Sequence, residues 1–527
     1  MTVLSVLTVT AVWISCGSPG GRSIEQPPKA AAPAPVSSEA STGKLIDVFE
    51  TLVPRILDDA GVPGAGVAVV HQGRIVYQRG FGYADKDKKQ MVGDTTGFNI
   101  GSISKTVAAW GVMKLVEDGK LELDAPVSNY LTRWQLPKSE HNASGVTVRR
   151  LLSHTAGLSL HGYPGFGPED TLPSLEESLS GKTNGAGSVE LIMAPGTEWK
   201  YSGGGYTLAQ LLVEEITGVP FARYMRESVL RPLGMKNSDY DLTAEILASS
   251  ATCYDGWGNA TANPRFTAQA AAGLHTTIAD LARFAAAGLS GPAGARPGRG
   301  VLRPESIALM LAAAPATDGE YGLGYAIDSL PDGSKSTGHG GANRGWHAYF
   351  TTVAKTGEGI VVTTNGDNGS AVHMQIRCAW TKWLTGSFPA GDRCKKPVLL
   401  PVVRALSSGS GEQARDVYLH CKNNLADQYF FSENQLNRVG YQLLAHKRVA
   451  DAIVIFQLNV SEYPDAFNTH DSLGEAYLLA GKRELSLASY RKSLELNPNN
   501  EHARQIIEKL DSTPSPVPAN SASPDPG

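Results

Sequence analysis

Cysteine is scarce in this chain of 527 residues, and the few cysteines lie far apart. They are Cys16, Cys253, Cys378, Cys394 and Cys421, and no two form a Cys-x-x-Cys pair. A zinc site built on cysteines is therefore disfavoured, and we predict no metal or organic cofactor. If Cys16 has a separate role, the remaining four could pair in an exported chain, and the sequence leaves the pairing open.

The chain also lacks an excess of charge of one sign and long hydrophobic runs. Its formal net charge is −4, so it has no polycationic surface of the kind that binds nucleic acid. Beyond the N-terminus, no apolar run is long enough to span a bilayer. Hydrophobic residues make up 42% and charged residues 19%, which is ordinary for a globular protein with room for two or three domains.

Several motifs of common enzyme classes are missing. No Gly-x-Ser-x-Gly sequence occurs, which disfavours an α/β-hydrolase. The sequence Gly-Lys-Thr at 181–183 lacks the glycine five residues earlier that a phosphate-binding loop needs. Ser153 and His154 are adjacent and cannot form the hydrogen bond of a catalytic triad, so we interpret that pair as structural.

The first 16 residues are predicted to be an export signal, because residues 2–14 form an apolar run too short for a transmembrane helix. The small residue before Cys16 resembles a bacterial lipoprotein cleavage site, at which Cys16 would carry the lipid. Trp13 stands where such sites usually carry Leu, and no Lys or Arg precedes the run. Lipidation, secretion and a misplaced start codon therefore stay open. We expect the bacterial cell envelope, in the periplasm or on the outer surface, with membrane attachment only through the lipid.

Composition divides the rest of the chain. Residues 17–43 are rich in Pro, Ala, Ser and Gly and predict a disordered linker, and residues 44–387 predict one large globular domain. A polar connector is expected at 388–430, helical repeats at 431–511 and a disordered Pro/Ser tail at 512–527.

The repeats rest on a period of 34 residues (474 − 440), at which Gly440 recurs as Gly474 and Phe456 as Tyr490. The order of small and aromatic residues resembles the tetratricopeptide helix–turn–helix unit. Two such units make a small stack, for which we expect a protein or peptide partner.

Hydrophobic periodicity predicts the main elements of the large domain. Two strands are expected around a turn at 71–74, a short helix at 146–152, a loop at 162–187 and a helix at 207–217. Late strands are expected at 321–327, 336–341, 346–353 and 359–364, followed by a helix at 370–384.

The first candidate site is Ser102-Ile-Ser-Lys105, ahead of a stretch that predicts a helix closed by Gly119. Ser102 would lie at the helix N-terminus, with Lys105 one turn further on the same face. Burial and the helix dipole would lower the pKa of the amine, and a neutral amine beside a hydroxyl is a general base beside a nucleophile. When this motif is considered alone, a Ser N-cap followed by a solvated Lys explains the same sequence.

The second candidate is Tyr201, which precedes Ser202 and Gly203 on a Gly-rich loop that leads into a helix. Its phenol could work with Lys105 to pass the proton of Ser102 to the leaving group. A tyrosine that merely packs after a Pro-Gly turn is the alternative.

The third candidate is His339, which with Gly340 and Gly341 lies on a predicted edge strand that backbone and ligand can approach closely. We expect the N–H of Ala342 to join that of Ser102 as an oxyanion donor. We also expect His339 to offer a switchable charge to a substrate carboxylate or to the tyrosine. A histidine at a strand end is the alternative.

In this order and spacing, Ser-x-x-Lys, Tyr-Ser-x and His-x-Gly resemble the serine β-lactamase and penicillin-binding protein superfamily. The resemblance is to the branch with class C β-lactamases, DD-peptidases, D-aminopeptidases and related esterases. It covers roughly residues 44–384 and extends to the sequences at 98–105 and 152–158, to Pro195-Gly and to Tyr325. It implies an α/β (α+β) fold, in which an antiparallel sheet is flanked by helices and an all-helical subdomain lies in the middle of the chain.

The resemblance also implies roles for the candidates. Ser102 would be the acylated nucleophile, Lys105 its base partner and Tyr201 the second acid/base group. Relatives usually have Asn where this chain has Gly203, and many have Lys where it has His339. Both changes remove groups that would serve an acidic β-lactam.

We therefore predict an exported serine hydrolase that acts through an acyl-enzyme on an amide or ester, as a peptidase or esterase. A β-lactamase or D-Ala-D-Ala carboxypeptidase is the first alternative. A catalytically silent peptide-binding sensor is the second.

Overall fold

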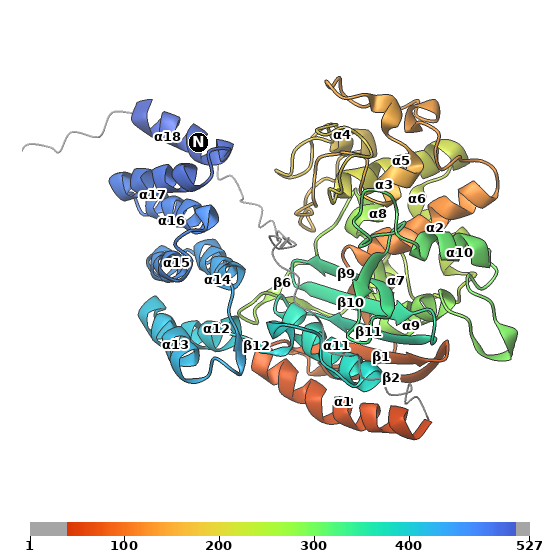
Figure 1. Ribbon diagram of the computed structural model, residues 1–527, viewed down its shortest axis with the longest axis horizontal. Coiled ribbons are helices and arrows are strands. Elements are labelled where there is room, and N and C mark those ends of the chain that lie inside the picture. The colour runs from red at the N-terminus through yellow and green to blue at the C-terminus, as the bar shows by residue number, and fades with distance from the viewer. Residues whose placement is uncertain (1–38, 513–527) are drawn as a thin grey trace, which may run out of the picture. The chain divides into compact units, whose positions relative to one another are not determined.

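The computed structural model describes residues 39–512, which divide into two units at Cys394 and Lys395 (Figure 1). The predicted export signal with Cys16, and nearly all of the predicted linker and tail, lie outside the described residues. Within residues 39–512, no helix combines the length and the apolar character needed to cross a membrane.

A sheet of seven strands, all paired antiparallel, is the centre of the first unit. Its order is β3-β2-β1-β11-β10-β9-β8, so an early strand and a late strand meet in the middle. The bounds are β1 (Gly64–His71), β2 (Arg74–Asp85), β3 (Gln90–Met91), β8 (Ala326–Ser329), β9 (Lys335–Asn343), β10 (Trp346–Val353) and β11 (Glu358–Thr364). The predicted antiparallel sheet is thus confirmed.

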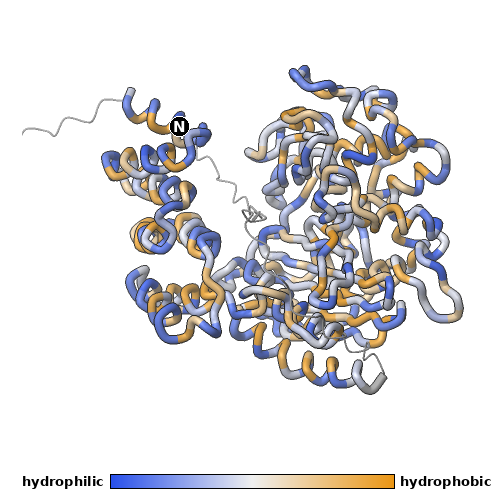
Figure 2. The backbone as a smooth tube through the Cα atoms, in the orientation of Figure 1, coloured by the Kyte–Doolittle hydropathy of each residue, from blue (hydrophilic) through white to orange (hydrophobic). Residues whose placement is uncertain are grey.

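Helices cover both faces of this sheet (Figure 1). Helix α1 (Glu39–Ala60) and helix α11 (Gly369–Thr385) pack on each other and on one face. On the other face, α9 (Ile278–Ala287) packs against the central strands and α2 (Ile103–Glu117) contacts β9. Because both faces are covered, every residue of β1 and β11 is buried and these strands are hydrophobic along most of their length (Figure 2).

A helical subdomain interrupts the sheet in the middle of the chain, as predicted. It begins after β4 (Gly97–Asn99), which pairs with β7 (His275–Thr277) and so closes the two ends of the insertion. Its other elements are α3 (Val148–Leu152), α4 (Leu175–Leu179), α5 (Gly203–Thr217), α6 (Phe221–Met225), α7 (Ala244–Ser249), β5 (Cys253–Tyr254), β6 (Ala260–Thr261) and α8 (Gln269–Ala272). Helix α10 (Pro304–Leu311) follows α9.

Helix α2 is buried on nearly all sides, which is typical of a core helix. It ends before Gly119, whose positive φ suits a helix stop, as the sequence predicts. The indole N–H of Trp110 in this helix donates to the hydroxyl of Tyr325 at 2.8 Å. The nucleophile candidate therefore stands at the end of a rigid, packed element.

Some element boundaries differ from the prediction. Helix α1 begins at Glu39, inside the predicted linker, and β8 begins only at Ala326. Helix α5 begins at Gly203 because the hydroxyl of Ser202 accepts the N–H of Gly205 and caps it. The predicted loop at 162–187 contains α4, which begins with a capping box.

One disulfide joins Cys378 of α11 to Cys394 at the end of the first unit, and their Cα atoms are 5.7 Å apart. Cys253 and Cys421 are free and buried. The pairing that the sequence left open is thus assigned.

The second unit is a stack of helices. Helices α14 (Glu433–Ala445) and α15 (Val449–Glu462) recur 34 residues later (467 − 433) as α16 (Phe467–Leu479) and α17 (Arg483–Leu496). Its other elements are β12 (Lys396–Pro397), α12 (Leu399–Ser408), α13 (Gly411–Asn424), β13 (Tyr429–Phe430) and α18 (Glu501–Ser512). Membership of the tetratricopeptide family stays a prediction.

The prediction of a connector at 388–430 is wrong for the part that forms α12 and α13. Both helices have buried faces, with Leu406 and Tyr418 fully buried, so this segment is part of the stack. The polar residues that suggested a connector form the turn between the two helices.

One contact repeats with the 34-residue period and provides a test of packing. A Cβ on Gly440 would lie 2.3 Å from the buried ring of Phe456, whereas a Cβ on Gly474 would lie 3.1 Å from the ring of Tyr490. We expect Gly440→Ala to lower the free energy of unfolding by about 1–3 kcal/mol through overpacking. Gly474→Ala should change it by less than about 1 kcal/mol, because the gain in helix propensity offsets a milder contact.

The measurement is chemical denaturation of the full chain, followed by far-UV circular dichroism. Equal destabilisation by the two substitutions would contradict the packing described for Gly440.

Candidate active site

Ser102 precedes α2 directly, and Lys105 lies one turn into the helix. The Lys105 amine donates to Ser102 Oγ at 3.0 Å and to the carbonyl oxygen of Ala271 at 2.7 Å. The predicted spacing thus brings an amine into hydrogen-bond contact with a hydroxyl. This is the arrangement of a general base beside a nucleophile.

Lys105 is only 2% exposed, and burial lowers the pKa of its amine to about 7. Burial disfavours the charged form, and no carboxylate contributes to the shift. A substantial fraction of the amine is therefore neutral near pH 7 and able to accept a proton.

Tyr201 reaches the same point from the loop before α5. Its ring lies under the Lys105 amine, 4.9 Å from nitrogen to centroid, and its side chain hydrogen-bonds to Ser102. Burial raises the pKa of the Tyr201 phenol, and the hydrogen bond with Ser102 opposes that shift. The phenol is therefore protonated and can donate to an oxygen or nitrogen at the site.

His339 lies on β9, and its pKa differs from the prediction. Burial lowers the pKa of its imidazole to about 4, so the ring is neutral at pH 7 and carries no switchable charge there. Nδ1 contacts the carbonyl oxygen of Gly340 at 2.5 Å, and because a carbonyl only accepts, Nδ1 holds the proton. Nε2 then accepts from the hydroxyl of Tyr321 at 2.9 Å, a residue that the sequence analysis did not single out.

The backbone of β9 lies directly against the loop that carries Ser102. A Cβ on Gly101 would stand 2.5 Å from Ala342 N, and a Cβ on Gly341 would stand 1.9 Å from the carbonyl oxygen of Ile100. Gly101 also has a φ of 50°, a conformation that favours glycine. The glycines therefore let the β9 backbone at Ala342 lie against the backbone just before Ser102, an approach that an oxyanion site built from the N–H groups of Ser102 and Ala342 would need.

Two asparagine amides hold this contact. Asn99 Oδ1 accepts from Gly101 N at 2.9 Å and from Asn343 Nδ2 at 2.6 Å. Both side chains also donate to the carbonyl oxygen of Ala272, at 3.1 Å each. Asn99 lies in one of the motifs that carried the resemblance, whereas no signal in the sequence marked Asn343.

The departure at Gly203 has a packing cause. Gly203 N donates to the carbonyl oxygen of His161 at 3.1 Å, and a Cβ on Gly203 would lie 3.0 Å from that same oxygen. A side chain at position 203 would therefore be crowded by the segment 161–163, which would have to move by a few tenths of an ångström.

The ring of Trp199 is 43% exposed and lies 6.0 Å from that of Tyr321 and 6.2 Å from that of Tyr201. His154 contacts Tyr201 more closely, with 4.1 Å between the ring centroids. The rim of the site is thus aromatic. In the described part of the chain, no group of three or more His, Cys, Asp or Glu side chains is arranged to hold a metal ion.

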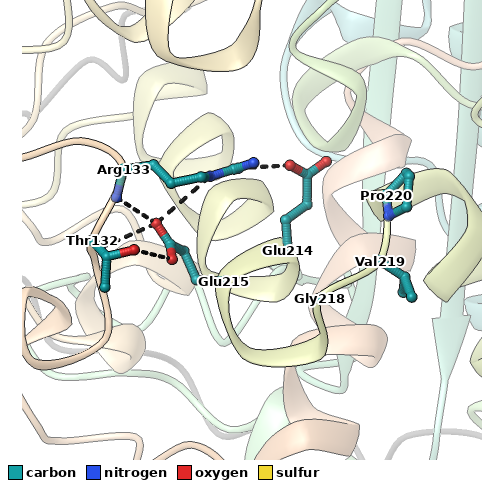
Figure 3. Close-up of a pocket in the computed structure, with 7 residues that line it drawn as sticks. All are labelled: Thr132, Arg133, Glu214, Glu215, Gly218, Val219 and Pro220. Atoms are coloured by element: carbon teal, nitrogen blue, oxygen red, sulfur yellow. Dashed lines mark hydrogen bonds and ion pairs between the residues drawn. The ribbon is translucent and has the colours of Figure 1, made fainter.

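A surface hollow of about 400 Å³ lies elsewhere, beside the C-terminal end of α5 (Figure 3). Arg133 donates to Glu214 at 2.7 Å, and Glu215 accepts from Arg133 N at 2.8 Å and from the Thr132 hydroxyl at 2.7 Å. The polar side chains that line it are engaged with one another. We interpret the network as a tie between the loop and the helix.

Comparison with known proteins agrees with this geometry. A sequence profile described as Beta-lactamase matches residues 49–377, which is more than half of the chain. The chain belongs to the beta-lactamase family. This member is 26% identical over 330 residues to the putative penicillin-binding protein PbpX of Bacillus subtilis (strain 168), covering 62% of this chain and 75% of that protein.

A second relative is protein flp of Staphylococcus aureus (strain NCTC 8325 / PS 47), which is 28% identical over 195 residues. That match covers 37% of this chain and 38% of the length of the staphylococcal protein.

Solved structures agree with the fold. The octameric penicillin-binding protein homologue from Pyrococcus abyssi matches with a TM-score of 0.54 and 26% identity, over 69% of this chain and 81% of that one. The D-alanine carboxypeptidase AmpC from Burkholderia cenocepacia matches with a TM-score of 0.52 and 21% identity, over 64% and 98%. At that identity the second likeness supports the fold alone.

The close approach of β9 and the loop that carries Ser102 generates a prediction. Gly341→Ala should push the strand away from Ile100 and lower ester turnover by about 100-fold or more, the usual cost of losing an oxyanion donor. Gly340→Ala is the matched control, because the nearest atom to its Cβ is 3.8 Å away. Steady-state kinetics on an aryl ester would check this, and similar turnover in both variants would contradict it.

Proposed function

We propose that this protein is a serine hydrolase that acts through an acyl-enzyme on an amide or ester substrate. The observation that carries the proposal is the contact of a buried Lys105 amine, with a pKa of about 7, with Ser102 Oγ at 3.0 Å. Membership of the beta-lactamase family supports it.

In the proposed reaction, Ser102 Oγ attacks the carbonyl carbon of the substrate and its proton passes to Lys105. The N–H groups of Ser102 and Ala342 stabilise the oxyanion that forms. As the intermediate collapses, the bond to the leaving group breaks and the leaving group takes a proton from Tyr201, which Lys105 restores. Water then attacks the acyl-enzyme by the reverse route and releases the acid.

The groups around the site favour a substrate without a carboxylate next to the scissile bond. His339 is neutral at pH 7 and already hydrogen-bonded to Tyr321, and position 203 carries no amide. The aromatic rim at Trp199 suits an apolar acyl or leaving group. A peptidase or esterase is therefore favoured.

A β-lactamase or D-alanine carboxypeptidase is the second candidate, because the relatives include a putative penicillin-binding protein and a structure titled as a D-alanine carboxypeptidase. A silent peptide-binding sensor is the third, and the lowered pKa of Lys105 argues against it.

Export to the cell envelope is proposed from the N-terminal sequence, and the disulfide between Cys378 and Cys394 supports it because such bonds persist in oxidising compartments. The stack of helices at 399–512 is proposed to bind a protein or peptide partner.

The proposal is tested with an activity probe. A fluorophosphonate should add to Ser102, with the adduct located by mass spectrometry, and Ser102→Ala should abolish labelling. Ser104→Ala is the matched control, because that hydroxyl accepts the N–H of Leu274 and should leave labelling intact. Labelling elsewhere, with activity surviving in Ser102→Ala, would overturn the assignment. Nitrocefin turnover and stable penicillin labelling would favour the second candidate.

The pH dependence follows from the lysine. Because the Lys105 pKa is about 7, kcat/KM for a neutral ester should rise about tenfold per pH unit below that value and level off above it. The pKa of His339 is about 4 and cannot give an inflection near 7. A pH–rate profile checks this, with Lys105→Met expected to lose turnover and the exposed Lys200→Met to keep the inflection. An active Lys105→Met variant with the same inflection would refute it.

A further inference from the structure

His154 holds the segment around Tyr201 by three contacts. Its carbonyl oxygen accepts from Lys200 N at 2.8 Å, and its Nδ1 accepts from Ser202 N at 3.0 Å. Its ring lies 4.1 Å from the ring of Tyr201, centroid to centroid, with the planes tilted by 35°. One residue therefore contacts the tyrosine itself and the residue on each side of it.

The protonation state of His154 is fixed by these contacts. Since Nδ1 accepts a backbone N–H, the ring is the neutral form with its proton on Nε2. His154 is 2% exposed, and burial holds the pKa of its imidazole well below the usual range. Within the described residues, Nε2 is buried and has no hydrogen-bond partner. Nδ1 supplies an acceptor for Ser202 N that an apolar ring could not, so packing alone does not explain a histidine here.

The backbone of His154 is also unusual. Its φ is 60°, in the left-handed region, which costs a residue with a side chain about 1–2 kcal/mol. This conformation follows directly on α3, after which the N–H of Thr155 donates to the carbonyl oxygen of Arg150. The turn points both the carbonyl oxygen and the ring of His154 at residues 200–202.

We propose that His154 is a positioning residue that aims the Tyr201 phenol at the leaving group of the substrate. It touches no reacting atom and acts through Tyr201, whose side chain hydrogen-bonds to Ser102. Without an acceptor at Nδ1, the N–H of Ser202 loses its partner and the segment around Tyr201 is free to shift. The inference rests on the proposed acyl-enzyme function.

The leaving group provides a readout that a purely structural role would not move. When the carbon–oxygen bond of an alkyl ester breaks, the departing alkoxide must take a proton, and Tyr201 supplies it. When the same bond of a p-nitrophenyl ester breaks, the phenolate departs without a proton. A displaced phenol therefore slows the cleavage of alkyl esters selectively.

The experiment compares two variants of His154 on the full chain, with one alkyl and one p-nitrophenyl ester of the same acid. His154→Phe keeps a ring and removes the acceptor. We expect it to lower kcat/KM on the alkyl ester, which reports acylation, by about 10- to 100-fold, as for a misplaced catalytic group, with kcat/KM on the aryl ester changed less than about threefold. His154→Asn places an oxygen near Nδ1 and tolerates the left-handed conformation, so it should recover most of the alkyl activity.

His373→Phe is the matched control. This buried histidine stacks on Tyr349 between α11 and the sheet, with 5.4 Å between the centroids, away from the site. It should leave the ratio of alkyl to aryl activity unchanged whatever its effect on the melting temperature. When His154→Phe is added to Tyr201→Phe, activity on the alkyl ester should fall little further, because both substitutions act through the same phenol.

The outcomes separate this inference from the proposed function. If the wild-type protein gives no fluorophosphonate adduct on Ser102, the acyl-enzyme function fails. The positioning role is overturned if Ser102 is labelled but His154→Phe lowers activity on both esters equally. It is also overturned if His154→Asn recovers no activity on the alkyl ester.

Discussion

The burial of the Lys105 amine is the constraint on which the candidate site depends. Moving a charged ammonium into the core between α2 and α8 would cost several kcal/mol, so the proton is held weakly. A carboxylate within reach would remove this effect, because it would stabilise the ammonium and raise the pKa. The amine is instead hydrogen-bonded to two neutral oxygens, from Ser102 and Ala271, as the proposed exchange of a proton with the serine requires.

Three elements far apart in the chain converge on this amine. The N-terminus of α2 supplies the serine, the turn before α5 supplies the phenol, and β9 supplies a backbone edge. The last contact depends on the absence of side chains at Gly101 and Gly341, since a Cβ at either position would meet the backbone of the other element. Both glycines thus act by allowing main chain to meet main chain.

Much of this arrangement could be predicted from the sequence. The period of the strands predicted the antiparallel sheet, and the three-residue spacing of Ser102 and Lys105 predicted their contact. Spacing along one helix is enough for that inference, because its geometry is fixed.

The rest depends on tertiary contacts that no local pattern records. The lowered pKa of His339 follows from its burial. Its ring contacts Tyr321, a residue 18 positions away that no motif marked. Asn343 and His154 act through backbone atoms of distant loops. The segment at 399–424 appeared to be a connector because its polar turn is more conspicuous than the buried faces of α12 and α13.

The packing of residues 161–163 on Gly203 has a consequence for substitutions at position 203. Because a Cβ at position 203 would lie 3.0 Å from the carbonyl oxygen of His161, an asparagine there would require a small shift of the loop backbone. Loop and motif are therefore coupled, so a side chain at position 203 fits best together with a change in the loop.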